Sequence, residues 1–404
     1  MGKFIKDDII RNEGDVEDLM DGIMDKNNNE KQIVNFKKKK VAIVHDFLTQ
    51  YGGAEKVLES LCEIFPDAPI YTLLYDRGKM HGKFGKKEVR TSFLNNFPEF
   101  IKKRKRYLLP FMMTAPEAFD LRDFDLVVSS SGAWSKGIVT RLNTKHIAYL
   151  HSPIRFVWDY NEKYLSDIGK KAGFLKRFIL NYVRVWDHQA SQRPDVLLVN
   201  SDYTRRRIEK YYRRTSEIVY PPAFVDDDYV RTEKRKEEKY FLVVSRLSAY
   251  KKVDLVVRSF DKLGLPLCVV GEGEQEEYLK KIATKNVKIV GWKNEKILKK
   301  YYAHARALIF PTVDDFGLTA VEAMSFGVPV IGIRKGGMKE IIDEGVNGEF
   351  FDEQTVEVLS DGIRRFMENE ETYNREKIMI GAAKFSKDRF KRNFCAAVDD
   401  ILKK

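Results

Sequence analysis

Three carboxylates surround a glycine in the stretch DDFGLTAVEAM, and their spacing would suit one wall of a ligand pocket. Asp314 and Asp315 precede Gly317, and Glu322 follows on the second turn of a helix that we predict over 318–326. Ionised carboxylates accept hydrogen bonds from hydroxyl groups, and the first turn of a helix presents free N–H groups to anions. The pattern therefore indicates a hydroxylated anion such as a sugar nucleotide. The structural alternative is that an aspartate caps the helix and Glu322 is solvated.

Two cations lie in the segment SRLSAYKK, directly after the strand-like run FLVV. Arg246 comes at the end of this predicted strand, and Lys251 follows five residues later at the start of the next helix. Ligands of open α/β sheets bind at the carboxyl ends of strands, so two cations at this position suit a diphosphate. A solvated basic loop is the alternative.

The segment VGEGEQE has part of a dinucleotide-binding fingerprint. Gly271 and Gly273 are followed by Glu276 where a third glycine is expected, and the next strand lacks the acid that would hold a ribose. We therefore expect no redox cofactor. The two glycines either let the backbone approach a ligand or form an ordinary turn.

A histidine follows another predicted strand in the stretch HIAYLHSPIRFVWDY. His151 precedes Pro153 and lies close in sequence to Arg155 and Trp158. A neutral imidazole can donate or accept a hydrogen bond, and an indole ring can stack on a ligand. A purely structural role is the alternative for this single histidine.

A basic run lies between apolar residues in FIKKRKRYLLPFMM. Its five consecutive cations are Lys102, Lys103, Arg104, Lys105 and Arg106. Cations mixed with apolar side chains suit an anionic membrane surface. A solvated basic face or a nucleic-acid contact is the alternative.

The composition limits the class of protein. A chain of 404 residues with 43% hydrophobic residues can form two or three domains with real cores, and its net charge of +12 favours anionic partners. Cys62, Cys268 and Cys395 are far apart and lack metal-ligand spacing, which indicates free thiols in a reducing compartment. No apolar run reaches the ~20 residues of a membrane span, and the N-terminus lacks the apolar core of a signal peptide. We therefore expect a cytoplasmic protein, with peripheral contact at the inner face of the membrane left open.

Strand-like apolar runs alternate with helical patterns from Val41 onward, and a Pro-Pro turn with a charged stretch over 220–240 divides them into two groups. Such alternation implies βαβ units with parallel sheets, so we predict an α/β protein with two Rossmann-like domains facing a central cleft. The predicted parts are a polar extension at 1–38, an N-terminal domain at 39–221, a C-terminal domain at 222–385 and a helix at 386–404 that packs back towards the N-terminal domain.

Taken in order, these motifs resemble the family 4 glycosyltransferases, which are retaining enzymes of the GT-B fold. The matching motifs are Gly52–Gly53 after the first strand, LHSP, SRLSAYKK, VGEGE and DDFGLTAVEAM, and the resemblance runs from about Val41 to the C-terminus. It implies that the N-terminal domain binds an acceptor and the C-terminal domain binds a nucleotide sugar.

The resemblance also implies a role for each matching residue. Arg246 and Lys251 would stabilise the departing diphosphate in place of a metal ion, and His151 would hydrogen-bond the transferred sugar, which makes these three the catalytic set. Glu322 would hold the ribose and Asp314 the sugar; family members usually have glutamate at 314, so Asp315 is a candidate substitute. The full set of implied donor-binding residues is Gly52, Gly53, Arg246, Lys251, Gly271, Asp314, Asp315, Phe316, Gly317, Leu318, Thr319 and Glu322.

The stretches HSPIRFVWDY and FDLVVSSSGAWSKGIV resemble, more narrowly, bacterial and archaeal transferases that build surface polysaccharides such as lipopolysaccharide. This likeness implies transfer of a hexose, with mannose from GDP-mannose as the first choice, to a glycan or lipid-linked glycan, without a metal or cofactor and without nucleic acid. The alternatives are a UDP-sugar donor, an epimerase or phosphorylase of the same fold, or a non-catalytic basic protein that binds membranes or nucleic acid.

Overall fold

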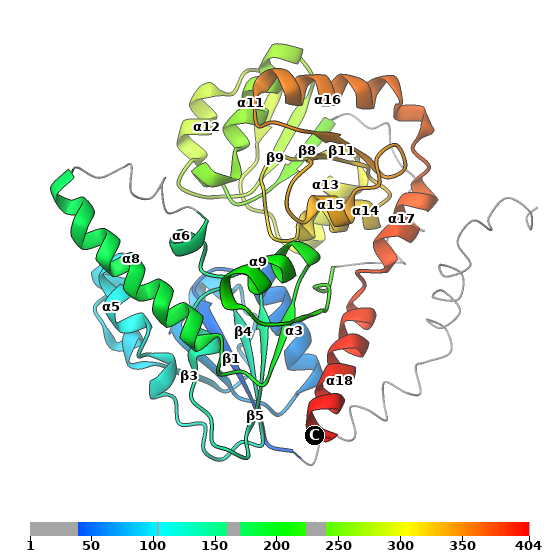
Figure 1. The fold of residues 1–404 in the computed structure, drawn as a ribbon. Helices are drawn as coiled ribbons and strands as arrows, with labels where there is room; N and C mark the ends of the chain where they lie inside the picture. The colour runs from blue at the N-terminus through cyan, green and yellow to red at the C-terminus, as the bar shows by residue number, and fades with distance from the viewer. Residues whose placement is uncertain (1–38, 103–104, 160–169, 224–239, 404) are drawn as a thin grey trace, which may run out of the picture.

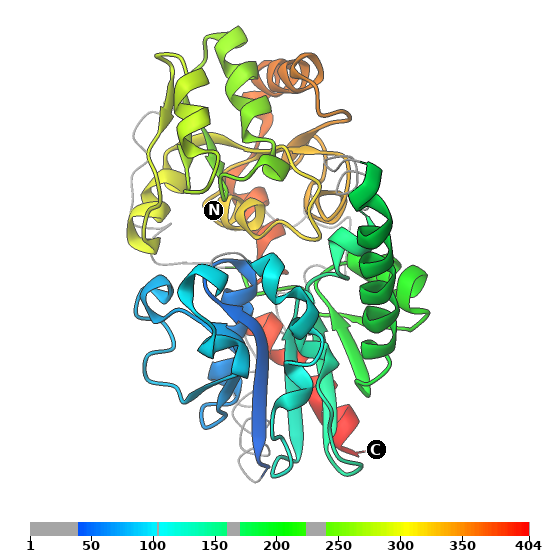
Figure 2. The ribbon, with the colours of Figure 1, turned by 90° about the vertical axis from the view of Figure 1, so that its left-hand side faces the viewer.

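The computed structural model describes residues 39–102, 105–159, 170–223 and 240–403. The predicted extension at 1–38 and most of the predicted linker lie outside these residues. The described chain forms two lobes, one above the other in Figures 1 and 2, and each lobe is built on one parallel sheet.

The sheet of the N-terminal lobe has the strand order β3-β2-β1-β4-β5-β6-β7. Its strands are β1 (Val41–Leu48), β2 (Ile70–Tyr75), β3 (Val89–Thr91), β4 (Leu126–Ser131), β5 (Lys145–Leu150), β6 (Val196–Val199) and β7 (Glu217–Ile218). The predicted apolar runs coincide with β1, β2, β4, β5 and β6. These strands are almost wholly buried, as expected where helices cover both faces of a parallel sheet.

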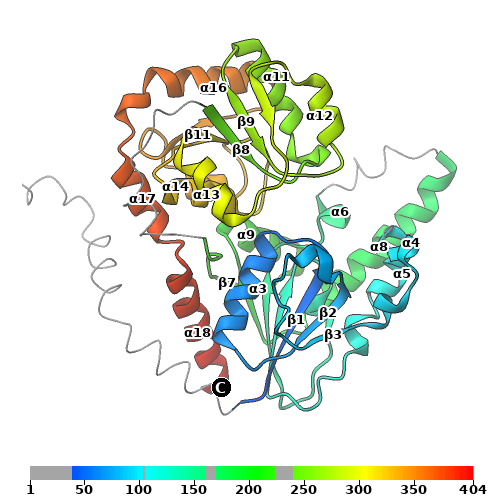
Figure 3. The ribbon, with the colours of Figure 1, turned by 180° about the vertical axis from the view of Figure 1, so that it is seen from behind.

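Helices of very different length surround this sheet. They are α3 (Gly53–Ile64), α4 (Glu99–Lys102), α5 (Leu109–Met112), α6 (Arg155–Trp158), α8 (Lys170–Ala190) and α9 (Asp202–Tyr212). Short 3₁₀ turns complete the lobe: η1 (Arg77–Met80), η2 (Phe93–Asn96), η3 (Lys105–Leu108), η4 (Pro116–Ala118) and η5 (Ser135–Gly137). The long helix α8 contacts α6 and η5, and its first turns project beyond the lobe in Figures 1 and 3.

The sheet of the C-terminal lobe has the order β10-β9-β8-β11-β12-β13. Its strands are β8 (Tyr240–Val244), β9 (Leu267–Val270), β10 (Val287–Ile289), β11 (Ala305–Phe310), β12 (Val330–Ile333) and β13 (Gly348–Phe351). Helices cover both of its faces: α11 (Val253–Leu263), α12 (Glu276–Ile282), α13 (Glu295–Ala303), α14 (Leu318–Ser325), α15 (Met338–Ile341), α16 (Val356–Glu368) and α17 (Arg375–Ala383), with the 3₁₀ turns η6 (Ala249–Lys251) and η7 (Glu370–Thr372).

Both sheets share the doubly wound order 3-2-1-4-5-6, counted from the first strand of each lobe. In this topology the strand order reverses between the first and fourth strands, which are β1 and β4 in one lobe and β8 and β11 in the other. Loops diverge at this reversal and leave a crevice where ligands bind. The predicted fold class, two Rossmann-like α/β domains, is therefore confirmed.

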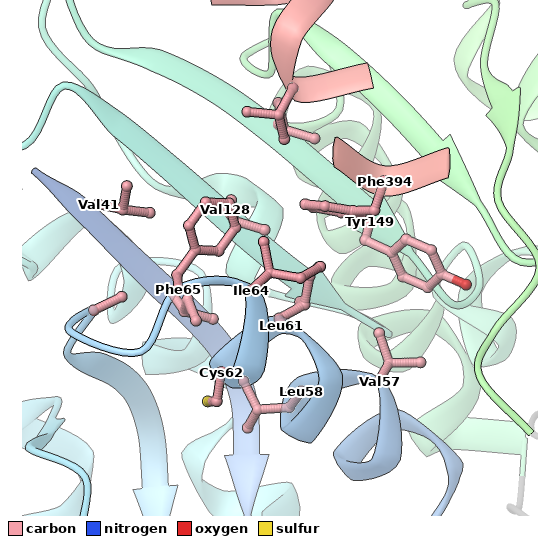
Figure 4. Packing of buried hydrophobic residues seen from close by; sticks show 14 of the residues in the cluster. Val41, Val57, Leu58, Leu61, Cys62, Ile64, Phe65, Val128, Tyr149 and Phe394 are labelled. Atoms are coloured by element: carbon pink, nitrogen blue, oxygen red, sulfur yellow. The ribbon is translucent and has the colours of Figure 1, made fainter. Parts of the chain in front are cut away.

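The last helix, α18 (Lys387–Lys403), packs on the N-terminal lobe, where it contacts α3 and β5. Phe394 is fully buried in a core that includes Val57 of α3 and Tyr149 of β5, as Figure 4 shows. Lys387 and Lys391 add ion pairs to Glu63 of α3. Burial of this apolar helix face holds the end of the chain against the lobe in which the chain begins.

Within the described residues, no helix has the length and apolar character that a membrane span requires. Cys62, Cys268 and Cys395 are buried free thiols.

Candidate active site

The predicted motifs meet where the carboxyl ends of the two sheets face one another. Gly53, the first residue of α3, lies so close to α14 that a Cβ atom built on it would be 2.9 Å from Leu318 Cδ1. On the same side, Arg246 donates a hydrogen bond to Gln50 Oε1 at 2.9 Å, from one lobe to the other. Glycine at position 53 therefore permits the close approach of the two lobes at this point.

The DDFG turn follows β11 and leads into α14, which begins at Leu318 as predicted and ends one residue before the predicted end. Gly317 has a φ of 126°, and a Cβ atom there would lie 2.1 Å from Met338 Cε. Gly337 has the same function on the other side of the turn, because its Cβ would lie 2.4 Å from the Phe316 carbonyl oxygen. Glycines thus fix the path of the backbone into α14 and keep its N-terminus open.

Asp314 is held between two cations from different parts of the fold. Lys251 forms an ion pair with its Oδ2, and Arg155 of α6 contacts its Oδ1 at 3.3 Å. Burial alone would raise the pKa of Asp314, but Lys251 and Arg155 outweigh burial, so the pKa lies below its ordinary value. Asp314 is therefore ionised at neutral pH.

Asp315 is the centre of a buried ion-pair network between the lobes. Arg155 Nε donates to its Oδ2 at 3.0 Å, and Arg207 of α9 forms an ion pair with its Oδ1. Arg207 also pairs with Asp159, so both arginines are shared between two carboxylates. Since both oxygens of Asp315 face arginines of the N-terminal lobe, its position favours a role in joining the lobes.

Glu322 is buried on α14, and both of its oxygens have partners. Lys56 of α3 forms an ion pair with Oε1 across the lobes, and Tyr302 donates a hydrogen bond to Oε2 at 2.9 Å. Burial and the neighbouring Glu322 both raise the pKa of Tyr302, so its hydroxyl stays protonated and donates. The alternative that Glu322 is solvated is thereby excluded.

Arg246 and Lys251 lie in the loop between β8 and α11. Arg246 comes two residues after the end of β8, and Lys251 closes the 3₁₀ turn η6 instead of opening α11, because α11 begins at Val253. Within the described residues, the side-chain hydrogen bonds of Arg246 go to the neutral side chains of Gln50 and Tyr250. Its guanidinium is exposed, so its charge is accessible to an anion in the cleft.

Gly271 follows β9 and packs against the backbone of this loop. A Cβ atom on Gly271 would lie 1.8 Å from the Ser245 carbonyl oxygen, and one on Gly273 would lie 2.4 Å from that of Leu247. Both glycines have left-handed φ values, 147° and 157°. Glycine is needed at both positions because the loop after β9 approaches the backbone of the loop after β8 so closely.

The side chain of Phe316 is buried between Tyr220 and Phe385, with ring centroids 5.9 Å and 5.3 Å away. Its ring is thus part of the core of the C-terminal lobe, and only its backbone can line the pocket. Leu318 and Thr319 form the open first turn of α14, and both are partly exposed. Gly52 precedes α3 as its N-terminal flanking residue.

His151 directly follows β5, and its Nε2 lies 2.8 Å from Ser130 Oγ of β4. Its backbone is fixed on both sides, because its N–H donates to Ser131 O and its carbonyl accepts from Asn200. Burial, and then the nearby His45, lower the pKa of His151 to about 4. The imidazole is therefore neutral at physiological pH. Trp158 stacks on Tyr211 with ring centroids 4.7 Å apart, so this face of the indole is already covered.

The residues Lys56, Arg207 and Tyr302 were not predicted from the sequence. Lys56 directly follows the GGAE stretch on α3, and its position one helical turn from Gly52 is a weak local signal. Arg207 and Tyr302 are parts of ordinary amphipathic helices, and their sequence context gives no indication of their partners. Within the described residues, no group of three or more His, Cys, Asp or Glu side chains has an arrangement that would hold a metal ion.

The basic run begins with the last residue of α4. Lys102 donates to the Asn95 carbonyl oxygen at 3.2 Å and pairs with Glu99. Lys103 and Arg104 lie outside the described residues. Lys105 and Arg106 begin η3.

Comparison with known proteins gives matches over both lobes. The family model described as Glycosyltransferase Family 4 matches residues 51–229, and the model described as Glycosyl transferases group 1 matches residues 225–383. A glycosyltransferase of Methanocaldococcus jannaschii is 22% identical over 82% of this chain and 89% of its own length. A second one from that organism is 30% identical, but the match spans 32% of this chain and 36% of the relative.

A GDP-mannose-dependent alpha-(1-6)-phosphatidylinositol monomannoside mannosyltransferase of Mycobacterium tuberculosis is 27% identical over 43% of this chain and 52% of its own length. Among solved structures, Anabaena HepE in complex with UDP-glucose has a TM-score of 0.64 at 16% identity, over 90% of this chain and 100% of that one. Sucrose-phosphate synthase of Thermosynechococcus elongatus has a TM-score of 0.67 at 16% identity, over 90% and 99% of the two chains.

The two family models adjoin at the boundary between the lobes, and the structural neighbours have the same arrangement of two parallel sheets. The chain therefore belongs to the family 4 glycosyltransferases, enzymes of the GT-B fold.

Proposed function

We propose that this protein is a retaining glycosyltransferase that moves a hexose from a nucleoside diphosphate sugar to a glycan or lipid-linked glycan. The observation that carries the proposal is the meeting of exposed Arg246 with Lys251, ionised Asp314 and buried Glu322 around the open N-terminus of α14. A diphosphate would find two cations and helix N–H groups there, and hydroxyl groups would find carboxylate acceptors. A non-catalytic basic protein would not require this combination, whereas an epimerase of the same fold would bind the same donor and is distinguished by the lack of transfer to an acceptor.

The donor would replace contacts that the cleft side chains now make with one another. The diphosphate takes Lys251 from Asp314, which frees Asp314 for a sugar hydroxyl, and the ribose takes the place of Lys56 at Glu322 Oε1. Tyr302 keeps its hydrogen bond to Glu322 Oε2 and so holds the carboxylate in position.

Arg246, Lys251 and the first turn of α14 would stabilise the negative charge that develops on the leaving diphosphate, which is the main catalytic contribution expected of this site. These cations take the place of a metal ion in the proposed mechanism. The leaving phosphate would receive the acceptor's proton on the face from which the acceptor attacks, so the anomeric configuration is retained. Contact between the lobes excludes water and limits hydrolysis of the donor.

GDP-mannose is the first choice of donor. The mannosyltransferase of Mycobacterium tuberculosis supports this choice, and the UDP-glucose complex of HepE supports a UDP-sugar as the second choice. The test is a thermal-shift comparison of GDP, UDP and ADP, followed by turnover with the corresponding sugars and NMR of the product's anomeric proton. We expect one nucleotide to stabilise the protein, turnover in the presence of EDTA, and retention. Inversion, or binding of nucleic acid with a steep salt dependence and no nucleotide binding, would overturn the proposal.

We propose further that the acceptor is reached at an anionic membrane, through a surface formed by α4, η3, α5 and α8, here called the α4–α8 surface. Large apolar side chains on it are 45–68% exposed: Phe100, Tyr107, Phe111, Phe178, Tyr182 and Val185. On α8 the last three share one face, whereas Leu180 and Val183 of the opposite face are buried in a core that includes Met112 of α5 and Val157 of α6. Exposed aromatic residues beside the Lys102–Arg106 run match the chemistry of an anionic bilayer.

Sedimentation with vesicles of anionic and of neutral lipid tests the membrane proposal. Phe178→Ser with Tyr182→Ser should abolish sedimentation with anionic vesicles and leave nucleotide binding intact. Neutralising Lys102–Arg106 should have the same effect. The control is Ile380→Ser, because Ile380 is 56% exposed on α17 of the other lobe. Equal sedimentation of all variants would show that this surface does not bind the membrane.

A further inference from the structure

A chain of four polar side chains crosses the floor of the cleft in the N-terminal lobe. It joins Glu55 on the first turn of α3 to His45 of β1, Ser130 of β4 and His151 after β5, and these strands are neighbours in the sheet. The distances are 3.5 Å from Glu55 Oε1 to His45 Nε2, 3.1 Å from His45 Nδ1 to Ser130 Oγ, and 2.8 Å from Ser130 Oγ to His151 Nε2. The chain therefore ends at His151, to which the resemblance to the family assigns a hydrogen bond with the transferred sugar.

The first three members of this chain depend on one another for hydrogen bonds. Glu55, His45 and Ser130 are each at most 5% exposed. Buried polar groups are costly unless they are paired, so each link has to be made in a consistent direction. A hydrogen bond in the wrong direction at any link would leave two donors or two acceptors face to face.

The direction of the chain follows from its first member, because a carboxylate can only accept. His45 Nε2 must then carry a proton and donate it to Glu55. With that proton on Nε2 of a neutral ring, His45 Nδ1 accepts a hydrogen bond from the Ser130 hydroxyl. The Ser130 oxygen in turn accepts from His151 Nε2–H.

We propose that Glu55, His45 and Ser130 are positioning residues that keep the proton of His151 on Nε2 and present its Nδ1 as a hydrogen-bond acceptor to the donor sugar. The sugar contact itself rests on the proposed function, whereas the direction of the chain does not. Within the described part of the molecule, His151 Nδ1 makes no hydrogen bond. The low pKa of His151 supports the inference, since a neutral ring keeps Nδ1 as an acceptor.

This direction restricts which donor sugars bind productively. The hydroxyl that meets His151 must donate its proton, so a group that can only accept will not replace it. Fluorine in place of that hydroxyl removes the donor as completely as hydrogen does. If His151 presented an N–H group instead, fluorine would keep part of the contact.

The first test reads the tautomer directly and needs no substrate. The protein contains 6 histidines, so ¹⁵N-histidine labelling gives a simple long-range ¹H–¹⁵N spectrum, recorded at pH 8. His151→Gln and His45→Gln variants assign the two rings. We expect His151 to show a protonated Nε2 and an unprotonated Nδ1, and Ser130→Ala to move these two nitrogen shifts towards each other. A protonated Nδ1 in the unmodified protein, or identical spectra with and without the Ser130 hydroxyl, would overturn the proposal.

The second test uses deoxy and deoxyfluoro analogues of the active donor at each ring position. At the position that meets His151 we expect both analogues to lose kcat/KM equally, by about tenfold or more, which corresponds to a lost hydrogen bond of about 1.4 kcal/mol. A fluoro analogue that keeps most of the activity at that position would contradict the assigned direction. Absence of transfer with any donor would refute the proposed function, while the spectra would still decide the direction of the chain.

Discussion

Replacing Asp315 by asparagine tests whether this residue joins the lobes or binds the donor. Its carboxylate lies between Arg155 and Arg207, whose side chains are 26% and 7% exposed. Removing one member of a buried ion pair costs about 3–5 kcal/mol, because the remaining charge stays buried. Arg155 keeps Asp314 and Arg207 keeps Asp159, so we expect the lower end, about 3 kcal/mol, for the joined state.

A loss of about 3 kcal/mol shifts the equilibrium between joined and separated lobes about a hundredfold. Fluorescence energy transfer can measure this shift with labels on cysteines introduced at the exposed positions Lys86 and Glu353, one in each lobe. The three native cysteines are buried, so labelling would be selective. The control is Asp352→Asn, which removes a surface ion pair with Arg334 within the C-terminal lobe.

We expect Asp315→Asn to lower the energy-transfer efficiency and to leave the nucleotide affinity within about threefold of that of the unmodified protein, a difference of less than about 1 kcal/mol. The control variant Asp352→Asn should change neither quantity. Unchanged transfer efficiency together with a tenfold or greater loss of nucleotide-sugar affinity would refute this reasoning. Asp315 would then be a donor ligand, as the resemblance to the family allows.

Three further predictions concern stability. Gly317→Ala should lower the free energy of unfolding in urea by about 2 kcal/mol or more, because its φ is 126° and the added Cβ would clash with Met338. Gly264→Ala, at a φ of 67° with open space around the added Cβ, should lower it by about 1 kcal/mol. Equal losses would contradict the steric explanation. The pKa of Asp314 is lowered in the folded state, so its stabilising contribution is present above the unfolded pKa of about 3.9 and is lost as pH falls through the folded value. Asp314→Asn should therefore make the free energy of unfolding fall less steeply as the pH is lowered. The same acid dependence in both proteins would refute this explanation. Phe394→Ala should destabilise the N-terminal lobe by about 3–5 kcal/mol, and a loss below about 1 kcal/mol would show that α18 contributes little to that core.

Most of the fold could be predicted because buried parallel strands have continuous apolar sequences. The predicted run from Val41 is the first strand of the N-terminal sheet, and the predicted run from Ala307 lies in β11, the fourth strand of the C-terminal sheet. The edge strands β3, β7 and β13 were missed; each contains a charged residue and no more than two consecutive apolar residues. The site residues near Gly317 could be predicted because the acids and the glycine stand close together in the sequence DDFG.

The contacts between the lobes could not be predicted in the same way. Lys56 and Glu322 are 266 residues apart, and Arg207 and Asp315 are 108 residues apart. Nothing in the sequence around a lysine or arginine on an amphipathic helix indicates a partner at such a separation. The Glu55–His45–Ser130–His151 chain was missed for the same reason, because neighbouring strands bring its members together.

The most direct test of the proposed donor site is calorimetric titration of GDP and UDP into the unmodified protein, Glu322→Gln and Glu349→Gln. Glu349 is the matched control, since it is a buried glutamate of the same lobe that accepts a hydrogen bond from Tyr373 at 2.6 Å, as Glu322 does from Tyr302. A lost hydrogen bond to a charged group costs about 1.5–3 kcal/mol, so Glu322→Gln should weaken binding of the preferred nucleotide about 10- to 100-fold. Glu349→Gln should bind it as the unmodified protein does. Equal nucleotide affinity in all three proteins would contradict the assignment of Glu322 to the ribose and with it the proposed position of the donor.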